Sequence, residues 1–227
     1  MANVVITGAN RGIGLELARQ YAQDGWDVIA CVRDTKKARV LNMLDGNIHV
    51  LPLDVSDDKS ITKLAKSLKG KPIDLLINNA GIFGEGSQNF EKTNTKGWLK
   101  TFHVNCIGPL HVLEALAPNL AKGKLKVAAT ISSLMGSVSD LQSAGNYAYR
   151  SSKAAVNMTM AIAARDMKEQ KITVILLNPG WVQTDMGGVS APLVVEESVK
   201  GLRKVLAKVK PADSGKFINY DGKKLPW

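Results

Sequence analysis

Tyr149 and Lys153, within the stretch YAYRSSK (147–153), are the residues whose types and spacing most directly indicate chemistry in this chain. They are four residues apart, so on a helix they share one face, whereas Tyr147 would point to the opposite side. A neighbouring ammonium group is expected to lower the pKa of a tyrosine from its free value of about 10, because it favours the tyrosinate. Such a pair is suited to moving a proton to or from a ligand oxygen near neutral pH. A tyrosine and a lysine at this spacing are more often a packed ring and a surface lysine on one helix, without a catalytic role. Other motifs must therefore support the interpretation as a catalytic pair.

A glycine-rich loop near the start of the chain, TGANRGIG (7–14), follows a short apolar run and precedes a stretch with helical spacing. Glycines permit a tight turn and close approach of the backbone to a pyrophosphate, which the N–H groups and dipole of the following helix stabilise. The spacing is GxxxGxG instead of GxGxxG, and a glycine triplet alone is weak support for a dinucleotide site. From the loop itself, an ordinary glycine-rich turn remains the alternative.

These candidate residues lie in a chain where short apolar runs alternate with longer stretches of helical periodicity. Strands that are hydrophobic throughout and are followed by helices imply a parallel sheet covered on both faces, with right-handed crossovers. We therefore expect a single doubly wound α/β domain of Rossmann type over residues 1–227, with ligands beyond the carboxyl ends of about seven strands. The expected strands are 3–7, 27–32, 48–53, 73–77, 125–131, 172–178 and 216–219.

The composition of the 227 residues argues against several other classes of protein. No apolar run approaches the roughly 20 residues that span a bilayer, and no signal peptide is recognisable, so we expect a cytoplasmic protein without integral membrane association. The net charge of +10 comes from scattered lysines without interleaved aromatic residues. This pattern favours a solvated surface over a nucleic-acid partner, although the positive potential can help to attract a phosphorylated cofactor.

The cysteine and histidine residues show no ligand spacing for a metal. Cys31 and Cys106 lie in apolar surroundings and are expected to be reduced core residues. His49, His103 and His111 are widely separated and are expected to be structural. No metal cofactor is expected.

Several further motifs follow the glycine loop in a fixed order, and together they are far more specific than any one of them. The chain resembles the short-chain dehydrogenase/reductases, whose hallmarks are TGxxxGxG near the N-terminus and YxxxK near the middle, and the resemblance runs nearly end to end. The segment PGWVQTDMGG and the ending FINYDGKKLPW resemble the carbonyl reductase subgroup that includes sniffer and the C-factor proteins. The intervening motifs are LDV at 53–55, NNAG at 78–81, VN at 104–105, ISS at 131–133, NPG at 178–180 and TDM at 184–186.

The resemblance implies a reductase in which Tyr149 protonates the carbonyl oxygen of a small-molecule substrate as hydride arrives from the cofactor. It also implies that Lys153 holds the nicotinamide ribose, that Ser133 hydrogen-bonds the substrate carbonyl, and that Asn105 holds a water connecting Lys153 to solvent. Ser132 should face away, because adjacent strand residues point to opposite sides. The segment from Ser133 to Tyr149 is longer than in the most compact family members, and Asn105 could instead ease a helix kink.

The resemblance further implies a set of cofactor contacts at the ends of several strands. Asp54 is a candidate for the adenine amino group, although an aspartate after a strand is often only a helix cap. The expected cofactor-binding residues are Gly8, Asn10, Arg11, Gly12, Ile13, Gly14, Arg33, Asp54, Val55, Asn79, Ala80, Gly81, Tyr149, Lys153, Pro179, Gly180, Val182 and Thr184.

The end of the second strand indicates which dinucleotide binds. NAD-preferring relatives carry an acidic residue at this position. When the position is counted from Gly8 by the family's pattern, this chain has Val32 there. Arg33 and Arg11 could converge on the 2′-phosphate of NADPH, which is the expected cofactor. Two alternatives stay open: Asp34 could serve NAD if the alignment slips by two residues, and both arginines could simply lie on the surface.

Two expectations concern the whole protein. The helical stretch 149–164 carries apolar or small residues on more than one face, and relatives often pair through this helix and the one near 94–120, so we expect a homodimer or a homotetramer. The alternative to an enzyme is a dinucleotide-binding redox-sensing or signalling protein with little turnover, which the resemblance also allows. The presence of Ser133, Tyr149, Lys153 and Asn105 favours the enzyme.

Overall fold

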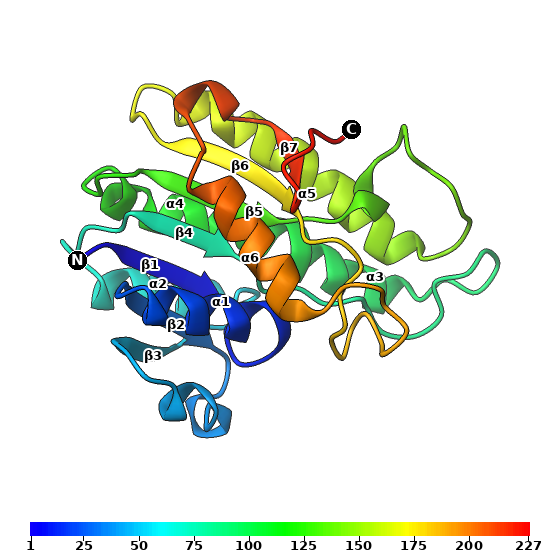
Figure 1. The fold of residues 1–227 in the computed structure, drawn as a ribbon. Coiled ribbons are helices and arrows are strands. Elements are labelled where there is room, and N and C mark those ends of the chain that lie inside the picture. Colours follow the sequence, from blue (N-terminus) through cyan, green and yellow to red (C-terminus); the bar gives the residue numbers. More distant parts are fainter.

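Seven parallel strands form one sheet in the order β3-β2-β1-β4-β5-β6-β7 in the computed structural model, which describes residues 1–227. Helices follow most of the strands and cover both faces of the sheet (Figure 1), so the expected doubly wound α/β fold is confirmed. The strands are β1 (Asn3–Thr7), β2 (Asp27–Val32), β3 (Ile48–Pro52), β4 (Leu75–Asn78), β5 (Val127–Ile131), β6 (Thr173–Asn178) and β7 (Phe217–Asn219). The α-helices are α1 (Gly12–Gln23), α2 (Asp58–Ser67), α3 (Thr95–Phe102), α4 (Gly108–Leu120), α5 (Tyr147–Asp166) and α6 (Val195–Leu206).

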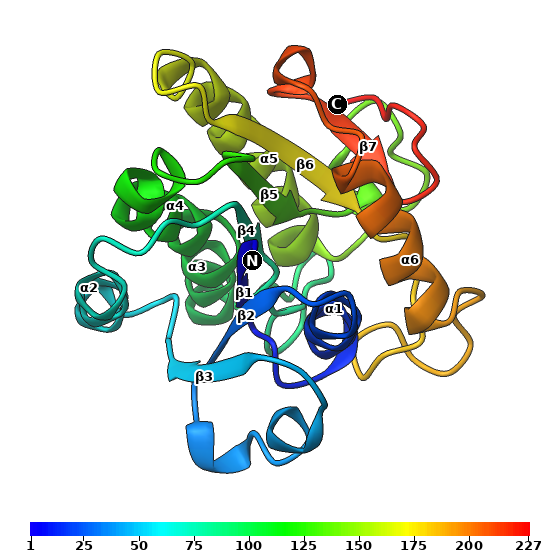
Figure 2. The ribbon, with the colours of Figure 1, turned by 60° about the vertical axis from the view of Figure 1, so that its left-hand side comes forward.

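Two hydrophobic cores lie on opposite faces of the sheet, because successive strand residues point to opposite sides. Val5 of β1 belongs to one core and its neighbour Val4 to the other. Leu116 of α4 packs into the first core, while Leu17 of α1 and Leu202 of α6 pack into the second. Figure 2 shows α1 and α6 on one side of the strands, with α2, α3 and α4 on the other.

The strand order reverses between β1 and β4, since β2 and β3 extend the sheet in one direction and β4 to β7 extend it in the other. At such a switch point the loops that leave two neighbouring strands diverge, and ligands of doubly wound sheets bind there. In Figure 1 the loops after β4, β5 and β6 lie beyond the arrowheads of the strands. The fold therefore brings the motifs of the sequence to one edge of the sheet.

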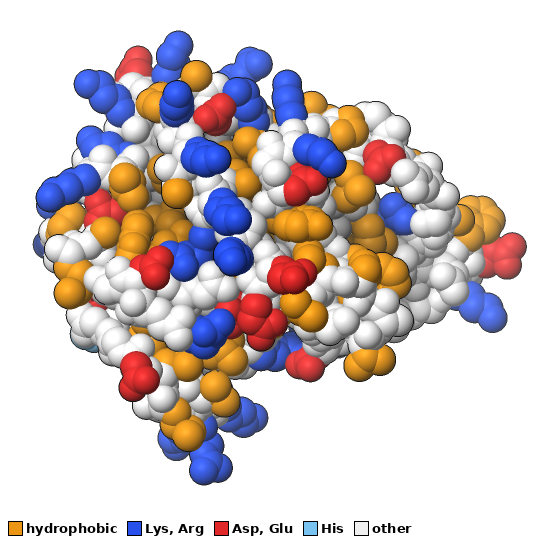
Figure 3. Space-filling model, in the orientation of Figure 1, with side chains coloured by type: hydrophobic (Ala, Val, Ile, Leu, Met, Phe, Trp, Pro, Cys, Tyr) orange, Lys and Arg blue, Asp and Glu red, His pale blue; other side chains and the backbone are white.

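The surface has no single region of one charge on the face shown in Figure 3, where lysine and arginine side chains are interspersed with acidic and apolar ones. None of the helices combines the length and the apolar character that crossing a bilayer requires.

Candidate active site

The loop between β1 and α1 is compact because glycines stand where a side chain would collide. Gly8 has a φ of +66°, and a Cβ there would lie 2.9 Å from the Cα atom of Ala80. A Cβ on Gly14 would lie 2.3 Å from the carbonyl oxygen of Gly8. Helix α1 begins at Gly12, and no side chain caps the N–H groups of its first turn. The first turn also contains no acidic residue. Unpaired N–H groups at the positive end of a helix dipole fit a phosphate group.

The loop after β4 is tied to this glycine loop by side-chain hydrogen bonds. The backbone N–H groups of Asn79 and Ala80 both donate to Oγ1 of Thr7 at 3.0 Å. The Asn79 amide nitrogen donates to the carbonyl oxygens of Thr7, at 2.9 Å, and Gly8, at 3.1 Å. Asn79 therefore fixes the geometry of the two loops, and Thr7 is a positioning residue that the sequence reasoning missed although it opens the TGxxxGxG motif.

Tyr149 and Lys153 both lie on the buried face of α5. The Lys153 Nζ atom is 5.7 Å from the centroid of the Tyr149 ring and donates a hydrogen bond of 2.9 Å to the carbonyl oxygen of Ile131, at the end of β5. Tyr147 is instead 38% exposed, with its ring 6.2 Å from that of Trp98. The prediction that Tyr149, not Tyr147, shares a face with Lys153 is confirmed.

Burial determines the titration of this pair. Burial raises the pKa of Tyr149, and a hydrogen-bonding interaction with Ser133 offsets only part of the increase. The expected net lowering of the Tyr149 pKa was wrong, because burial of the phenol is the largest effect and disfavours the charged tyrosinate. Burial also lowers the pKa of Lys153 to about 8. The phenol is therefore protonated at neutral pH, while Lys153 remains mostly charged.

Ser133 lies two residues after the end of β5. It caps the short 3₁₀ helix η4 (Leu134–Gly136), where its Oγ accepts a hydrogen bond of 3.2 Å from the N–H group of Met135. Ser132 faces the other way and donates to Oδ1 of the buried Asn157 at 2.5 Å. The structure therefore brings Ser133 next to Tyr149 and excludes Ser132, as predicted.

Asn105 lies in one turn of π-helix, His103–Ile107, between α3 and α4. Its Oδ1 accepts from the N–H group of Ile82 at 2.9 Å, and its Nδ2 donates to the carbonyl oxygen of Ile82 at 2.8 Å and to Oγ of Ser152 at 3.0 Å. A Cβ added to Gly81 would be 3.3 Å from the Asn105 Oδ1 atom and 3.8 Å from Lys153 Nζ. Asn105 thus joins the loop after β4 to α5. It does so from a π-helical turn, whereas the alternative that the sequence offered was the easing of a helix kink.

Gln88 holds the first turn of α5, which the sequence did not indicate. Its Oε1 accepts a hydrogen bond of 2.9 Å from the Tyr149 N–H group, and its Nε2 donates to the carbonyl oxygen of Phe83 at 2.9 Å. The Phe83 ring stacks on Tyr149 with centroids 4.8 Å apart. A glutamine in a polar loop gives no sequence signal for such a role, because its partner is 61 residues away.

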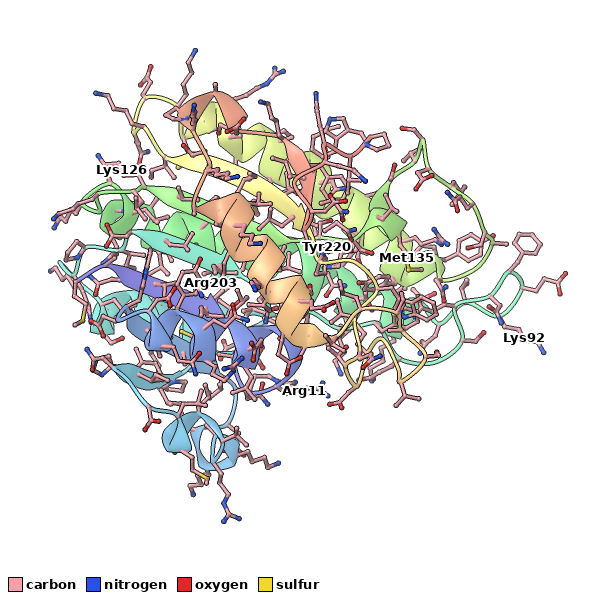
Figure 4. All side chains as sticks on the ribbon, in the orientation of Figure 1. Arg11, Lys92, Lys126, Met135, Arg203 and Tyr220 are labelled. Atoms are coloured by element: carbon pink, nitrogen blue, oxygen red, sulfur yellow. The ribbon has the colours of Figure 1, made fainter.

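The loop after β6 closes against the glycine loop. A Cβ on Gly12 would lie 3.3 Å from Cγ2 of Thr184, and Arg11 Nη1 forms an ion pair of 2.5 Å with Oδ2 of Asp185. Figure 4 shows Arg11 beside this loop. Val182 is buried, and Gly180 has a φ of +83°. Pro179, the remaining expected contact here, accepts a hydrogen bond of 2.6 Å from Ser198 through its carbonyl oxygen.

Around the end of β2, Val32 is buried and Arg33 is exposed. Asp34 caps a 3₁₀ helix by accepting a hydrogen bond of 3.0 Å from the Lys36 N–H group. Burial raises the pKa of Asp54, but hydrogen bonds from Ser56 and the positive charge of Arg33 outweigh it, so the net pKa is lowered. Its neighbour Val55 is buried. No group of three or more His, Cys, Asp or Glu side chains is arranged to hold a metal ion.

Known proteins resemble this chain over most of its length. The profile of the family described as short chain dehydrogenase matches residues 2–192. This chain belongs to the short chain dehydrogenase family. It is thus an oxidoreductase by family, with the fold that the sequence predicted.

Two carbonyl reductases with solved structures are similar to this chain over its whole length. The NADPH-bound carbonyl reductase from chicken fatty liver is 36% identical with a TM-score of 0.93, covering 100% of this chain and 99% of its own. The carbonyl reductase Sniffer of D. melanogaster is 33% identical with a TM-score of 0.92, covering 100% of both chains. The protein named C-signal of Myxococcus xanthus is 41% identical over 156 residues, which are 69% of this chain and 93% of that protein.

Proposed function

We propose that this short chain dehydrogenase is an NADPH-dependent reductase that transfers hydride to the carbonyl group of a small, rather apolar aldehyde, ketone or quinone. The observation that carries the proposal is the buried Tyr149, with Ser133 and Lys153 beside it, at the sheet edge where the glycine loop lies. Phe83 stacks on Tyr149, and Trp181 and Met186 are exposed in the loop after β6; these apolar side chains support an apolar substrate.

Ser133, Tyr149 and Lys153 each have a different role in carbonyl reduction. NADPH, when bound, supplies the hydride. Ser133 donates a hydrogen bond to the carbonyl oxygen, and Tyr149 transfers its phenolic proton to the same oxygen as negative charge develops there. The Lys153 ammonium group stabilises the tyrosinate that results. In the oxidative direction, the tyrosinate takes the proton back from the alcohol.

The proposal of NADPH, and not NADH, follows from the end of β2. Val32 offers no carboxylate for a ribose hydroxyl, and the carboxylate of Asp34 already caps a helix. Arg33 is free of ion pairs and can bind a 2′-phosphate, whereas Arg11 can join it only by leaving Asp185. NADPH in the carbonyl reductase from chicken fatty liver and NADP in a carbonyl reductase from Pseudomonas aeruginosa PAO1 support the same choice.

The direct test is oxidation of NADPH by the purified protein with a panel of aldehydes, ketones and quinones. We expect turnover with at least one apolar carbonyl compound and a higher kcat/KM with NADPH than with NADH. A protein that binds NADPH but reduces no member of the panel would contradict the enzyme. It would favour the second candidate, a dinucleotide-binding signalling or redox-sensing protein, which the identity to C-signal supports.

We further propose that residues 1–227 act as one domain, that the protein is cytoplasmic, and that it forms a homodimer or homotetramer. Cys31 and Cys106 are buried and unbridged, which supports a reducing compartment. Apolar side chains exposed on α3 and α5, among them Leu99, Met158 and Ile162, support a self-association surface.

A further inference from the structure

The residues after β7 turn back along that strand and end on the face of the sheet that α5 covers. Lys224 pairs with Ile218 in an antiparallel bridge, and the N–H group of Leu225 donates to the carbonyl oxygen of Phe217 at 2.9 Å. The ring of Trp227 stacks on the fully buried Phe217, with centroids 5.8 Å apart and planes 19° apart. This stack fixes the place of the last residue of the sequence.

Trp227 is also bonded to the segment that leads into α5, residues 137–146. Its carbonyl oxygen accepts a hydrogen bond of 2.9 Å from the N–H group of Ser139 and another from the Ser139 hydroxyl. The two ends of this contact are 88 residues apart in the chain. Figure 2 shows the C-terminal end beside β7 and close to this green segment.

Packing alone holds this segment weakly. Val138 is 76% exposed and Leu141 is 63% exposed. An open hollow of about 960 Å³ lies between α5 and the residues Gly136, Val138 and Trp227. Few apolar contacts therefore oppose movement of the segment. The hydrogen bonds to Trp227 are thus a larger part of what keeps it in one conformation.

The same segment begins one residue after η4, the 3₁₀ helix that Ser133 caps. The N–H group of Leu134 donates to Oδ1 of Asn178 at 3.0 Å, and a Cβ on Gly136 would lie 2.6 Å from the backbone carbon of Lys153. Only η4 separates Ser133 from the segment, so without the bonds to Trp227 the contacts at Leu134 and Gly136 would be the remaining restraints on the position of Ser133.

We propose that Trp227 is a positioning residue that holds the 137–146 segment, and through η4 the Ser133 hydroxyl, in place for catalysis. The effect on catalysis, the kinetic part of this inference, rests on the proposed reductase function. The holding of the 137–146 segment, its structural part, does not. Trp227 contacts neither substrate nor cofactor in this role, so it affects the carbonyl step and not the binding of NADPH.

The structural part is tested by hydrogen–deuterium exchange of the peptides that cover 134–146. Trp227→Ala keeps the backbone carbonyl that accepts both Ser139 hydrogen bonds but removes the ring that holds it against Phe217. We expect the amides of these peptides to exchange roughly three- to tenfold faster, the effect of weakening about one hydrogen bond, and Trp227→Phe to restore most of the protection. Ser139→Ala, which removes only the exposed hydroxyl donor, should give a smaller increase. Trp26→Ala is the matched control, since it removes an aromatic ring that contacts Tyr21 at 4.9 Å on the other side of the sheet. Exchange in 134–146 that is unchanged by Trp227→Ala, or increased equally by Trp26→Ala, overturns the proposal.

The kinetic part is tested by a double-mutant cycle with Ser133→Ala, using NADPH and an aromatic aldehyde. We expect Trp227→Ala to lower kcat about three- to tenfold with an unchanged Kd for NADPH, and to have no further effect when Ser133 is already alanine. Additive losses, or a loss shared by Trp26→Ala, mean that Trp227 supports the fold alone and contradict the positioning role. A wild-type protein without turnover contradicts the reductase, while the exchange result still decides whether Trp227 holds the segment.

Discussion

At the scale of single residues, Tyr149 and Lys153 owe their chemistry to burial as much as to their spacing. Spacing alone predicts a tyrosine whose pKa is lowered by its lysine. In the structure, however, burial raises the pKa of the phenol and lowers that of the ammonium group. A protonated phenol is the form needed to donate a proton during carbonyl reduction, so the observed shift favours the reductive direction near neutral pH.

Replacement of Tyr149 by Phe removes the hydroxyl group that donates the proton. It should affect cofactor binding much less than it affects proton transfer. We expect kcat to fall about 10²- to 10⁴-fold, with the Kd for NADPH almost unchanged. Tyr147→Phe is the matched control, because it makes the same change two residues away on the exposed side of α5. The assignment fails if Tyr147→Phe proves the inactive variant and Tyr149→Phe retains turnover.

Lys153 makes the stability of the protein depend on pH. Its pKa is about 8 in the folded state and 10.5 when unperturbed, so between these values the unfolded chain binds more protons. The free energy of unfolding therefore gains from this group as pH rises from 8 to 10.5, and the penalty of burying the charge is fully present below pH 8. We expect Lys153→Met to raise the Tm at pH 7, and this advantage to shrink by pH 10. Thermal unfolding of both proteins from pH 6 to 10 tests this, and an advantage that grows with pH contradicts it.

Arg33 is expected to select the dinucleotide. One charge-assisted contact is worth about 1.5–3 kcal/mol, so Arg33→Ala should raise the Kd for NADPH by about one to two orders of magnitude and change that for NADH little. Arg39→Ala removes an exposed arginine from the loop between β2 and β3 and serves as the control. A wild type that prefers NADH, or an unchanged preference in Arg33→Ala, would remove the basis for NADPH.

At the scale of elements, the sequence predicted the strands to within two residues at either end, because most of them are apolar runs buried on both faces. It did not predict the π-helical turn at Asn105 or the anchoring of η4 and α5. These features depend on single side chains with distant partners, such as Gln88 on Tyr149 and Asn178 on Leu134. Local periodicity contains no information about such contacts.

The close packing of η4 on α5 makes Gly136 a test of how these elements position the site. A Cβ there would lie 2.6 Å from the backbone carbon of Lys153, so Gly136→Ala must push the two elements apart. We expect a loss of about 1–3 kcal/mol in the free energy of unfolding and a fall in kcat of about ten- to a hundredfold. Gly123→Ala is the control, since its Cβ would lie 1.9 Å from the Ile73 carbonyl oxygen, away from the site. Equal effects of both variants on kcat would show that global strain, and not the position of η4, limits activity.

At the scale of the whole molecule, the order of the strands explains why residues from so many motifs meet. The glycine loop, the loop after β4 and the residues after β5 and β6 leave the same edge of the sheet around the switch point between β1 and β4. Alternation of strands and helices in the sequence was enough to predict this edge. It could not predict the Arg11–Asp185 ion pair, which joins loops 174 residues apart.

Assembly is the remaining property that belongs to the whole molecule. Met158 and Ile162 are one helical turn apart on α5 and are 65% and 53% exposed, and Ile107 on the adjoining π-helical turn is 41% exposed. Burial of these apolar side chains against a second copy would remove them from water, which is the main driving force for association. We expect light scattering to show a dimer or tetramer at micromolar concentration, and Ile162→Glu to give monomers. Val40→Glu places the same charge on another exposed apolar residue and should leave the assembly intact. A wild-type protein that is monomeric under these conditions excludes this surface as an interface.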